Sequence, residues 1–209
     1  MTVTLKNVGK SFSGKRIFSD VNLTIEPGKP IVLMGANGCG KSTLLKIITG
    51  VIPHTDGEIT QSSPGKISYM PDRFPKLPFK VNDYLFHMGE IQNISQIDEY
   101  IDKMFEYLTI PGHIKTQKIP KCSKGTIQKI NIMQAFMNKS DLLVMDEPFS
   151  GLDENSIERM LELIKKTALD ETAKTAIILS CHESALARRI TDDIYIFADG
   201  RCTRETFAD

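Results

Sequence analysis

A glycine-rich segment between an apolar run and a helix-forming run restricts what this chain can fold into more than any other feature. It fits the pattern G-x-x-x-x-G-K-[ST]. The apolar, β-prone run 30–34 leads into it, and the run 42–48 leads out, with Gly50 placed to cap the end of a helix. Glycines let a backbone curl around an anion, and a helix N-terminus adds partial positive charge. The segment therefore predicts a phosphate-binding loop made of Gly35, Ala36, Asn37, Gly38, Cys39, Gly40, Lys41, Ser42 and Thr43.

The loop also carries the side chains that a bound nucleotide triphosphate requires. Lys41 is placed to neutralise the β- and γ-phosphates, and the Ser42 hydroxyl to ligate Mg²⁺. Cys39 lies inside the loop at a helix N-terminus, a position that favours thiolate. Its alternatives are a redox role and a small tolerated residue, and the second is the more common. We therefore expect ATP with Mg²⁺ as the ligand.

Bulk properties exclude several classes of protein. The 209 residues suffice for one α/β domain, and 41% hydrophobic with 25% charged residues is ordinary for a globular chain. The 26 basic and 26 acidic residues cancel, so nothing indicates a nucleic-acid partner or a polybasic membrane anchor. The sequence predicts neither a bilayer span nor a secretion signal, and the four cysteines lack metal-type spacing.

Apolar runs alternate with helical patterns along the rest of the chain. Helices are predicted at 42–48 and 154–168, and a turn is predicted from Gly9 to Gly14. From about residue 73 to 140 the pattern is helical and predicts an inserted helical subdomain. The fold class that follows is α/β: a phosphate-loop (P-loop) NTPase core of mostly parallel sheet with an N-terminal antiparallel β subdomain. The predicted strands are 2–5, 17–25, 30–34, 58–60, 66–70, 142–145, 176–179 and 194–197.

Two acids, Asp146 and Glu147, directly follow an apolar strand. Hydrolysis of a phosphate ester needs one group to hold Mg²⁺ and another to position and deprotonate the attacking water. Adjacent residues at a strand end point in different directions, which separates the two tasks. The carboxyl ends of parallel strands are also where ligands gather.

With these motifs in order, the chain resembles an ATP-binding subunit of an ABC (ATP-binding cassette) transporter over nearly its whole length. Phe12 matches the aromatic residue on which that family stacks adenine, and His182 matches its switch histidine. Segment 122–126, Cys-Ser-Lys-Gly-Thr, is similar to the signature motif, and Ser150 to Asp153 to the D-loop. The Ser-Lys-Gly form resembles the exporter branch, whose membrane subunits are separate chains.

The resemblance implies an ATPase in which two chains, identical or similar, pack head to tail. Ser123 and Gly125 of one chain then close the ATP held by the other. It also implies a cytoplasmic protein held at the inner face of the membrane by a permease. The implied catalytic residues are Lys41, Glu147 and His182, and the implied metal ligands are Ser42 and Asp146.

The chain departs from the family pattern at two places. Asp72 stands where the family has the Q-loop glutamine, and it would either bind Mg²⁺ directly or repel the γ-phosphate and slow turnover. Lys124 and Thr126 replace the usual signature residues. Two alternatives therefore stay open: a non-transport ABC ATPase and a weakly hydrolytic nucleotide-sensing module.

Overall fold

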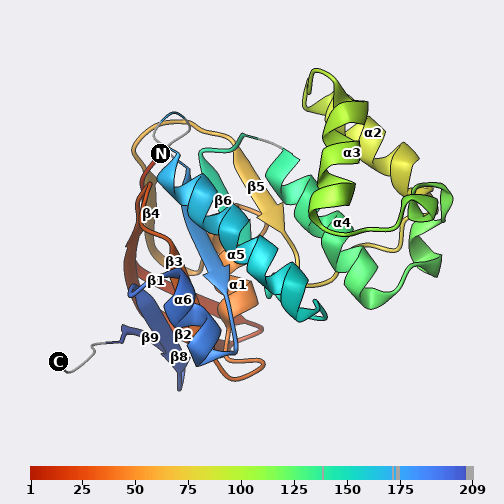
Figure 1. The fold of residues 1–209 in the computed structure, drawn as a ribbon. Helices are drawn as coiled ribbons and strands as arrows, with labels where there is room; N and C mark the ends of the chain where they lie inside the picture. The colour runs from red at the N-terminus through yellow and green to blue at the C-terminus, as the bar shows by residue number, and fades with distance from the viewer. Residues whose placement is uncertain (138, 171, 173–174, 206–209) are drawn as a thin grey trace.

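The apolar segments of the chain form two β-sheets, with helices between and around them (Figure 1). The structure is a computed structural model that describes residues 1–137, 139–170, 172 and 175–205. The predicted α/β class, with a mostly parallel sheet and an antiparallel β portion, is confirmed by the strand pairing. None of the helices within these ranges is long and apolar enough to cross a bilayer.

The central sheet has six strands, of which all but the last are parallel. Its strands β6 and β7 are buried on both faces, and the four side chains of β6 are each at most 1% exposed. Burial of an aliphatic side chain of this size stabilises a fold by roughly 1.5–3 kcal/mol. In spatial order the strands are β5 (Ile67–Met70), β6 (Leu142–Met145), β7 (Ala176–Ser180), β3 (Ile31–Gly35), β8 (Ile194–Ala198) and the antiparallel β9 (Arg201–Arg204).

The smaller sheet is antiparallel and has the order β2 (Lys15–Ile25), β1 (Val3–Phe12) and β4 (Asp56–Gln61). The prediction was wrong here, because β1 was expected to end at Leu5 and a turn to begin at Gly9. The turn is confined to Ser13 and Gly14, which have φ angles of 46° and 80°. Register shifts interrupt the β1–β2 pairing beyond Leu5, and they break the apolar–polar alternation that marks a strand in sequence.

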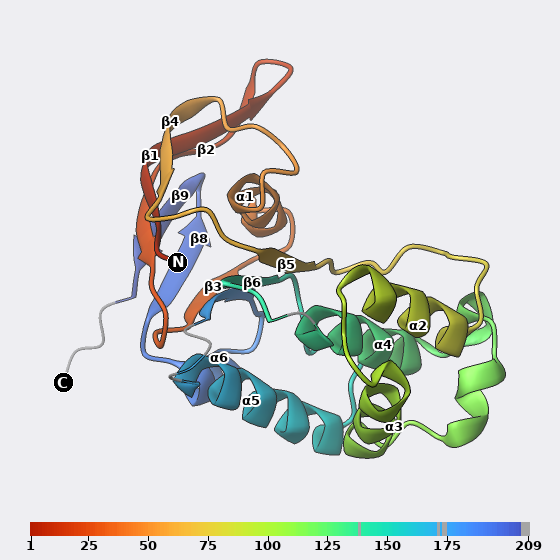
Figure 2. The ribbon, with the colours of Figure 1, turned by 90° about the horizontal axis from the view of Figure 1, so that it is seen from above.

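Helices cover both faces of the central sheet. Helix α1 (Lys41–Ile48) lies between the two sheets, whereas α5 (Glu154–Leu169) and α6 (Ser184–Ile190) lie on the opposite face (Figure 2). Alternate residues of β6 serve two cores: Leu142 and Val144 pack with α1, and Leu143 and Met145 pack with α5.

The remaining helices form an arm beside the sheet (Figure 2). All of them fall within the segment of about 73 to 140 that was expected to be a helical subdomain. The apolar face of α3 is buried at Ile97, Ile101, Met104 and Phe105. The elements of the arm are α2 (Val81–Ile91), α3 (Ile97–Tyr107), the 3-10 helices η1 (Gly112–Thr116) and η2 (Ile119–Lys121), and α4 (Lys124–Met137).

Candidate active site

The carboxyl ends of β3, β6 and β7 meet at one edge of the sheet, and a cavity of about 560 Å³ lies there. Ten of the residues singled out in the sequence line it, from four segments far apart along the chain. A larger cleft of about 770 Å³, between β2 and the segment before β8, is lined by none of them. The cavity at the strand ends is lined by Ile17, Asn37, Gly38, Gly40, Lys41, Ser42, Thr43, Asp72, Arg73, Glu147, Ser150 and His182.

The glycine-rich loop takes the tight path that its sequence predicts. Gly35 has a φ of 143°, and a Cβ at this position would lie 2.4 Å from the carbonyl oxygen of Phe197. Only glycine fits there. The Lys41 side chain is 5% exposed, and its Nζ donates to the carbonyl oxygens of Gly35 at 2.7 Å and Ala36 at 3.2 Å. The loop thus surrounds the Lys41 ammonium at the start of α1. The positive charge of Lys41 and the N-terminus of the helix both favour a bound anion.

Asp146 is fixed beneath the cavity, where it is 2% exposed. The Ser180 hydroxyl, at the end of the neighbouring strand β7, donates to Asp146 Oδ1 at 2.8 Å. The same Ser180 oxygen accepts the backbone N–H of Glu147 at 2.8 Å. One serine therefore fixes the positions of both acids at the end of β6.

Glu147 faces His182 across the cavity, with Oε1 and Nε2 2.9 Å apart. Burial raises the pKa of the Glu147 carboxyl, and the nearby Asp146 carboxylate acts in the same direction. The imidazole of His182 and the ammonium of Lys41 act against that rise in pKa. A carboxylate with a raised pKa is a stronger proton acceptor than an exposed one, which suits a general base.

The residues present fit a magnesium ion by the chemistry of their donors. Ser42 and Asp72 line the cavity, and Asp146 lies next to it, so every candidate ligand is a hard oxygen donor. Mg²⁺ is usually held by one or two protein oxygens together with phosphate oxygens and water. In the described part of the chain, no three His, Cys, Asp or Glu side chains gather as a metal cage.

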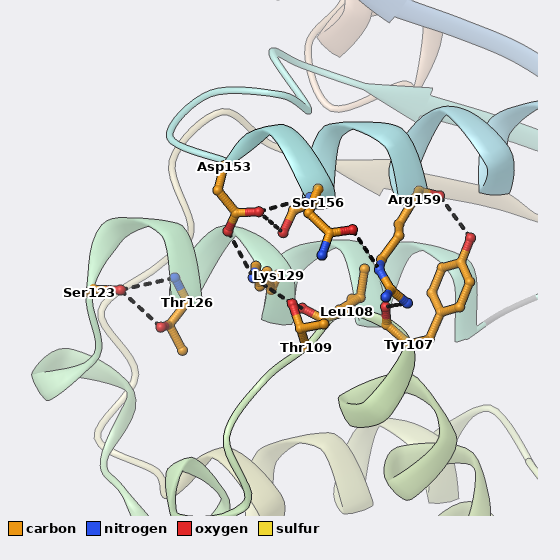
Figure 3. Close-up of polar contacts among 10 residues, drawn as sticks. Tyr107, Leu108, Thr109, Ser123, Thr126, Lys129, Asp153, Ser156 and Arg159 are labelled. Carbon is orange, nitrogen blue, oxygen red and sulfur yellow. Dashed lines mark hydrogen bonds and ion pairs between the residues drawn. The ribbon is translucent and has the colours of Figure 1, made fainter.

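Three of the predicted binding residues lie outside the glycine-rich loop, and none of them lines this cavity. Ser123 directly precedes α4, and Gly125 lies in the first turn of that helix. The exposed Ser123 Oγ accepts the Thr126 N–H at 3.1 Å (Figure 3). Phe12 is 46% exposed at the end of β1. Lys10 Nζ lies 4.7 Å from the centre of the Phe12 ring, a cation–π contact that supports one face of the ring.

Cys39 contributes to the loop without lining the cavity, and its Sγ lies 3.9 Å from Lys41 Nζ. All four cysteines are free thiols. Sequence reasoning gave no role to Ile17, Arg73 or Ser180. A polar residue that ends an apolar strand two positions before His182 was a signal that could have identified Ser180.

Comparison with known proteins gives two kinds of match. The family model described as ABC transporter matches residues 18–150. The zinc import ATP-binding protein ZnuC of Histophilus somni is 32% identical over 200 residues, which cover 92% of this chain and 71% of the relative. Its counterpart of the same name in Psychrobacter arcticus is 32% identical over 184 residues, or 87% of this chain and 73% of the relative.

Solved structures share the fold. An ATP-binding subunit of an ABC transporter superimposes with a TM-score of 0.85 at 24% identity, over 99% of this chain and 90% of the other. A dimeric ATP-binding cassette in a post-hydrolysis state with ADP and Pi bound gives 0.85 at 23% identity, over 99% of each chain.

Proposed function

The chain belongs to the ABC transporter family, and on that premise we propose that it hydrolyses ATP to power transport through a separate membrane permease. The observation that carries the proposal is the cavity in which the glycine-rich loop, Glu147 and His182 meet. A loop that binds phosphate, a buried acid and an imidazole 2.9 Å from it form the minimal set for activating water against a phosphate.

In this proposal Glu147 is the general base. Its carboxylate accepts a proton from the attacking water, and its raised pKa suits it to that step. His182 orients the carboxylate and donates toward the terminal phosphate. Lys41 holds the β- and γ-phosphates from within the loop. Mg²⁺, when bound through Ser42 and Asp146, supplies charge that favours the leaving phosphates.

Asp72 could either bind Mg²⁺ or repel the γ-phosphate, and its surroundings favour the first of these roles. It lines the cavity, and it forms an ion pair with Arg73, whose Nε lies 3.9 Å from Asp72 Oδ2. Arg73 lowers the net negative charge that Asp72 brings to the cavity. We therefore propose that Asp72 acts as a ligand of the metal, through water or directly, and does not repel the nucleotide.

We further propose that two copies, or this chain and a similar one, close on two ATP molecules head to tail. Ser123 and Gly125 do not line the cavity of their own chain, although Ser123 is exposed immediately before α4. A second chain would bring these residues to the nucleotide, and Phe12 would stack on its adenine. A cassette of the same fold is dimeric.

The membrane partner and the cellular location are proposals of the same kind. We propose, from membership of the ABC transporter family, that a separate permease holds the chain at the inner face of the membrane. The segment before α2 contains Phe79, which is 46% exposed, and this apolar residue suits a surface that receives a partner.

The direction of transport has two candidates. The Ser123-Lys124-Gly125 sequence favours export, which is the direction we propose. Import is the second candidate, because the two relatives that are 32% identical are named for zinc import. Transport assays on vesicles that contain this chain and its permease distinguish the two, because ATP supplied to the side that carries this chain drives cargo away from that side in export and toward it in import.

The test of the catalytic proposal is ATP turnover by the wild-type chain and by Glu147→Gln. The variant should still bind Mg-ATP but lose hydrolysis by roughly 10²–10⁴-fold, the usual contribution of a general base. Glu158→Gln is the matched control, because Glu158 pairs with Arg189 on the outside of α5. Equal turnover of wild type and Glu147→Gln removes Glu147 from this role. A wild type that binds Mg-ATP without hydrolysing it supports the nucleotide-sensing alternative.

A further inference from the structure

Glu147 has a backbone conformation that ordinary residues rarely adopt. Its φ is 51°, in the left-handed region that a side chain with a Cβ disfavours. Such a conformation persists only where the surroundings hold the peptide groups on both sides of the residue. The direction of the Glu147 side chain, and hence its pairing with His182, depends on those contacts.

The amino side of Glu147 is held by the core of the sheet. Its N–H donates to Ser180 Oγ, which itself donates to Asp146, both at 2.8 Å. The carbonyl side is held from a different part of the molecule. Gln128 Nε2 donates to the carbonyl oxygen of Glu147 at 3.1 Å and to that of Pro148 at 2.9 Å. Gln128 is 5% exposed, so water cannot readily replace these bonds.

Gln128 belongs to α4, and the first two turns of this helix hold the whole segment that follows Glu147. Lys124 Nζ donates to Ser150 Oγ at 3.0 Å. A Cβ on Gly125 would lie 2.8 Å from the carbonyl oxygen of Gly151, so helix and loop backbones are in direct contact. One turn further along, Lys129 Nζ lies 3.2 Å from Asp153 Oδ2 (Figure 3).

We propose that Gln128 is a positioning residue for Glu147, through which the helical arm sets the direction of the acid. The inference rests on the proposed function for its catalytic consequence, but the geometric claim stands apart from it. A displacement of α4 relative to β6 breaks the two bonds from Gln128, and the Glu147 peptide then leaves its left-handed conformation. The Glu147–His182 pair separates as a result.

The test compares Gln128→Met with Tyr100→Phe. Methionine keeps the length of the side chain and removes both donated bonds. Tyr100→Phe also removes a buried bond to an α4 carbonyl, that from Tyr100 Oη to Met133 O at 3.1 Å, but it lies far from Glu147 in the helix. The first readout is the set of His182 imidazole resonances in the nucleotide-free protein at fixed pH, identified as those missing from His182→Gln. Gln128→Met should shift them as Glu147→Gln does, and Tyr100→Phe should leave them in place.

The second readout is turnover with saturating Mg-ATP. Gln128→Met should lower kcat by roughly 10–10²-fold with little change in the Kd for Mg-ATP, because a misplaced reacting group costs about that much. Combined with Glu147→Gln it should cause no further loss. Should Gln128→Met fail to fold by circular dichroism, Gln128→Ala takes its place, since alanine also removes both donated bonds and favours the helix.

The inference is overturned if the Gln128 variants match Tyr100→Phe in both the His182 resonances and kcat, or if their kcat loss adds in full to that of Glu147→Gln. A wild type that binds no Mg-ATP refutes the proposed function alone. The resonance comparison still decides the role of Gln128 in that case.

Discussion

Asp153 joins three parts of the molecule through one carboxylate. It accepts the Ser156 N–H and the Ser156 hydroxyl, each at 2.9 Å, and so caps the N-terminus of α5. Its other oxygen lies 3.2 Å from Lys129 of α4 (Figure 3). Lys129 Nζ also donates to Thr109 Oγ1 at 3.5 Å, next to the end of α3. These bonds, the one from the Ser156 backbone first, lower the pKa of Asp153 from 3.8 to about 2.

The lowered pKa makes the stability that Asp153 provides depend on pH. A carboxyl whose pKa is lower in the folded state stabilises the fold above its unfolded pKa of 3.8, and this contribution is lost as pH falls through about 2. Asp153→Asn keeps a capping oxygen but not the charge. We expect it to be less stable than wild type at pH 7 by under about 1 kcal/mol, because the carboxylate is largely exposed.

Urea unfolding of both proteins between pH 7 and pH 3 measures this difference. The gap in free energy of unfolding should stay constant down to about pH 4 and then narrow. A gap that widens on acidification contradicts the assignment. Asp98→Asn, which removes a carboxylate from the first turn of α3, controls for the loss of a negative charge at a helix N-terminus.

At the scale of elements, α4 and the loop after β6 are packed too closely to admit a methyl group. Gly125→Ala would place Cβ 2.8 Å from a backbone oxygen of Gly151. We expect a net loss of up to about 2 kcal/mol, because overpacking costs about 1–3 kcal/mol and the better helix propensity of alanine offsets about 1 of it. Differential scanning calorimetry measures the loss. Gly112→Ala is the control, since nothing lies within 4 Å of its added Cβ. Equal melting temperatures for both variants contradict the close contact.

The elements that sequence patterns predict well are those buried on a regular face. Strand β6 has the predicted bounds, Leu142–Met145, and α5 (Glu154–Leu169) extends one residue past the prediction. The seven-residue helix α6 was missed, because two turns are too short for a helical periodicity to be distinguished from a loop. Strand β1 was cut short because bulges interrupt its alternation.

The candidate site could be predicted as far as local motifs reach. The loop, the acidic pair and the histidine can each be recognised from the residues next to them in the sequence. The topology of a parallel sheet then predicts that the strand ends that carry them lie together. The bond from Gln128 to Glu147 could not be predicted, because it spans 19 positions and depends on how α4 packs. The left-handed φ of Glu147 gives no sequence signal either, since glutamate has no preference for it.

At the scale of the whole molecule, the test is whether two chains associate around ATP. Size-exclusion chromatography of Glu147→Gln with Mg-ATP should show a dimer, because Ser123 and Gly125 can serve a nucleotide only in a second chain under the proposed function. Without nucleotide we expect a monomer. Adding Lys41→Ala to Glu147→Gln should abolish the dimer by removing the phosphate-binding cation.

A monomer at saturating Mg-ATP contradicts the homodimer. It would indicate that a similar but distinct chain or the permease completes the site, and it would strengthen the nucleotide-sensing alternative. Bound Mg-ATP in that monomer, measured by equilibrium dialysis, separates this outcome from a simple failure to bind.

The division of β6 between two cores has a consequence for how such a protein can diverge. Leu142 and Val144 belong to the wall behind α1 and the glycine-rich loop, whereas Leu143 and Met145 belong to the side that holds α4 and α5. Substitutions interact strongly only with their packing neighbours. Mutational drift on the arm side can therefore reshape the surface offered to a new membrane partner while the phosphate-binding wall keeps its shape. Proteins of this fold can therefore change their membrane partner while the phosphate-binding site stays intact.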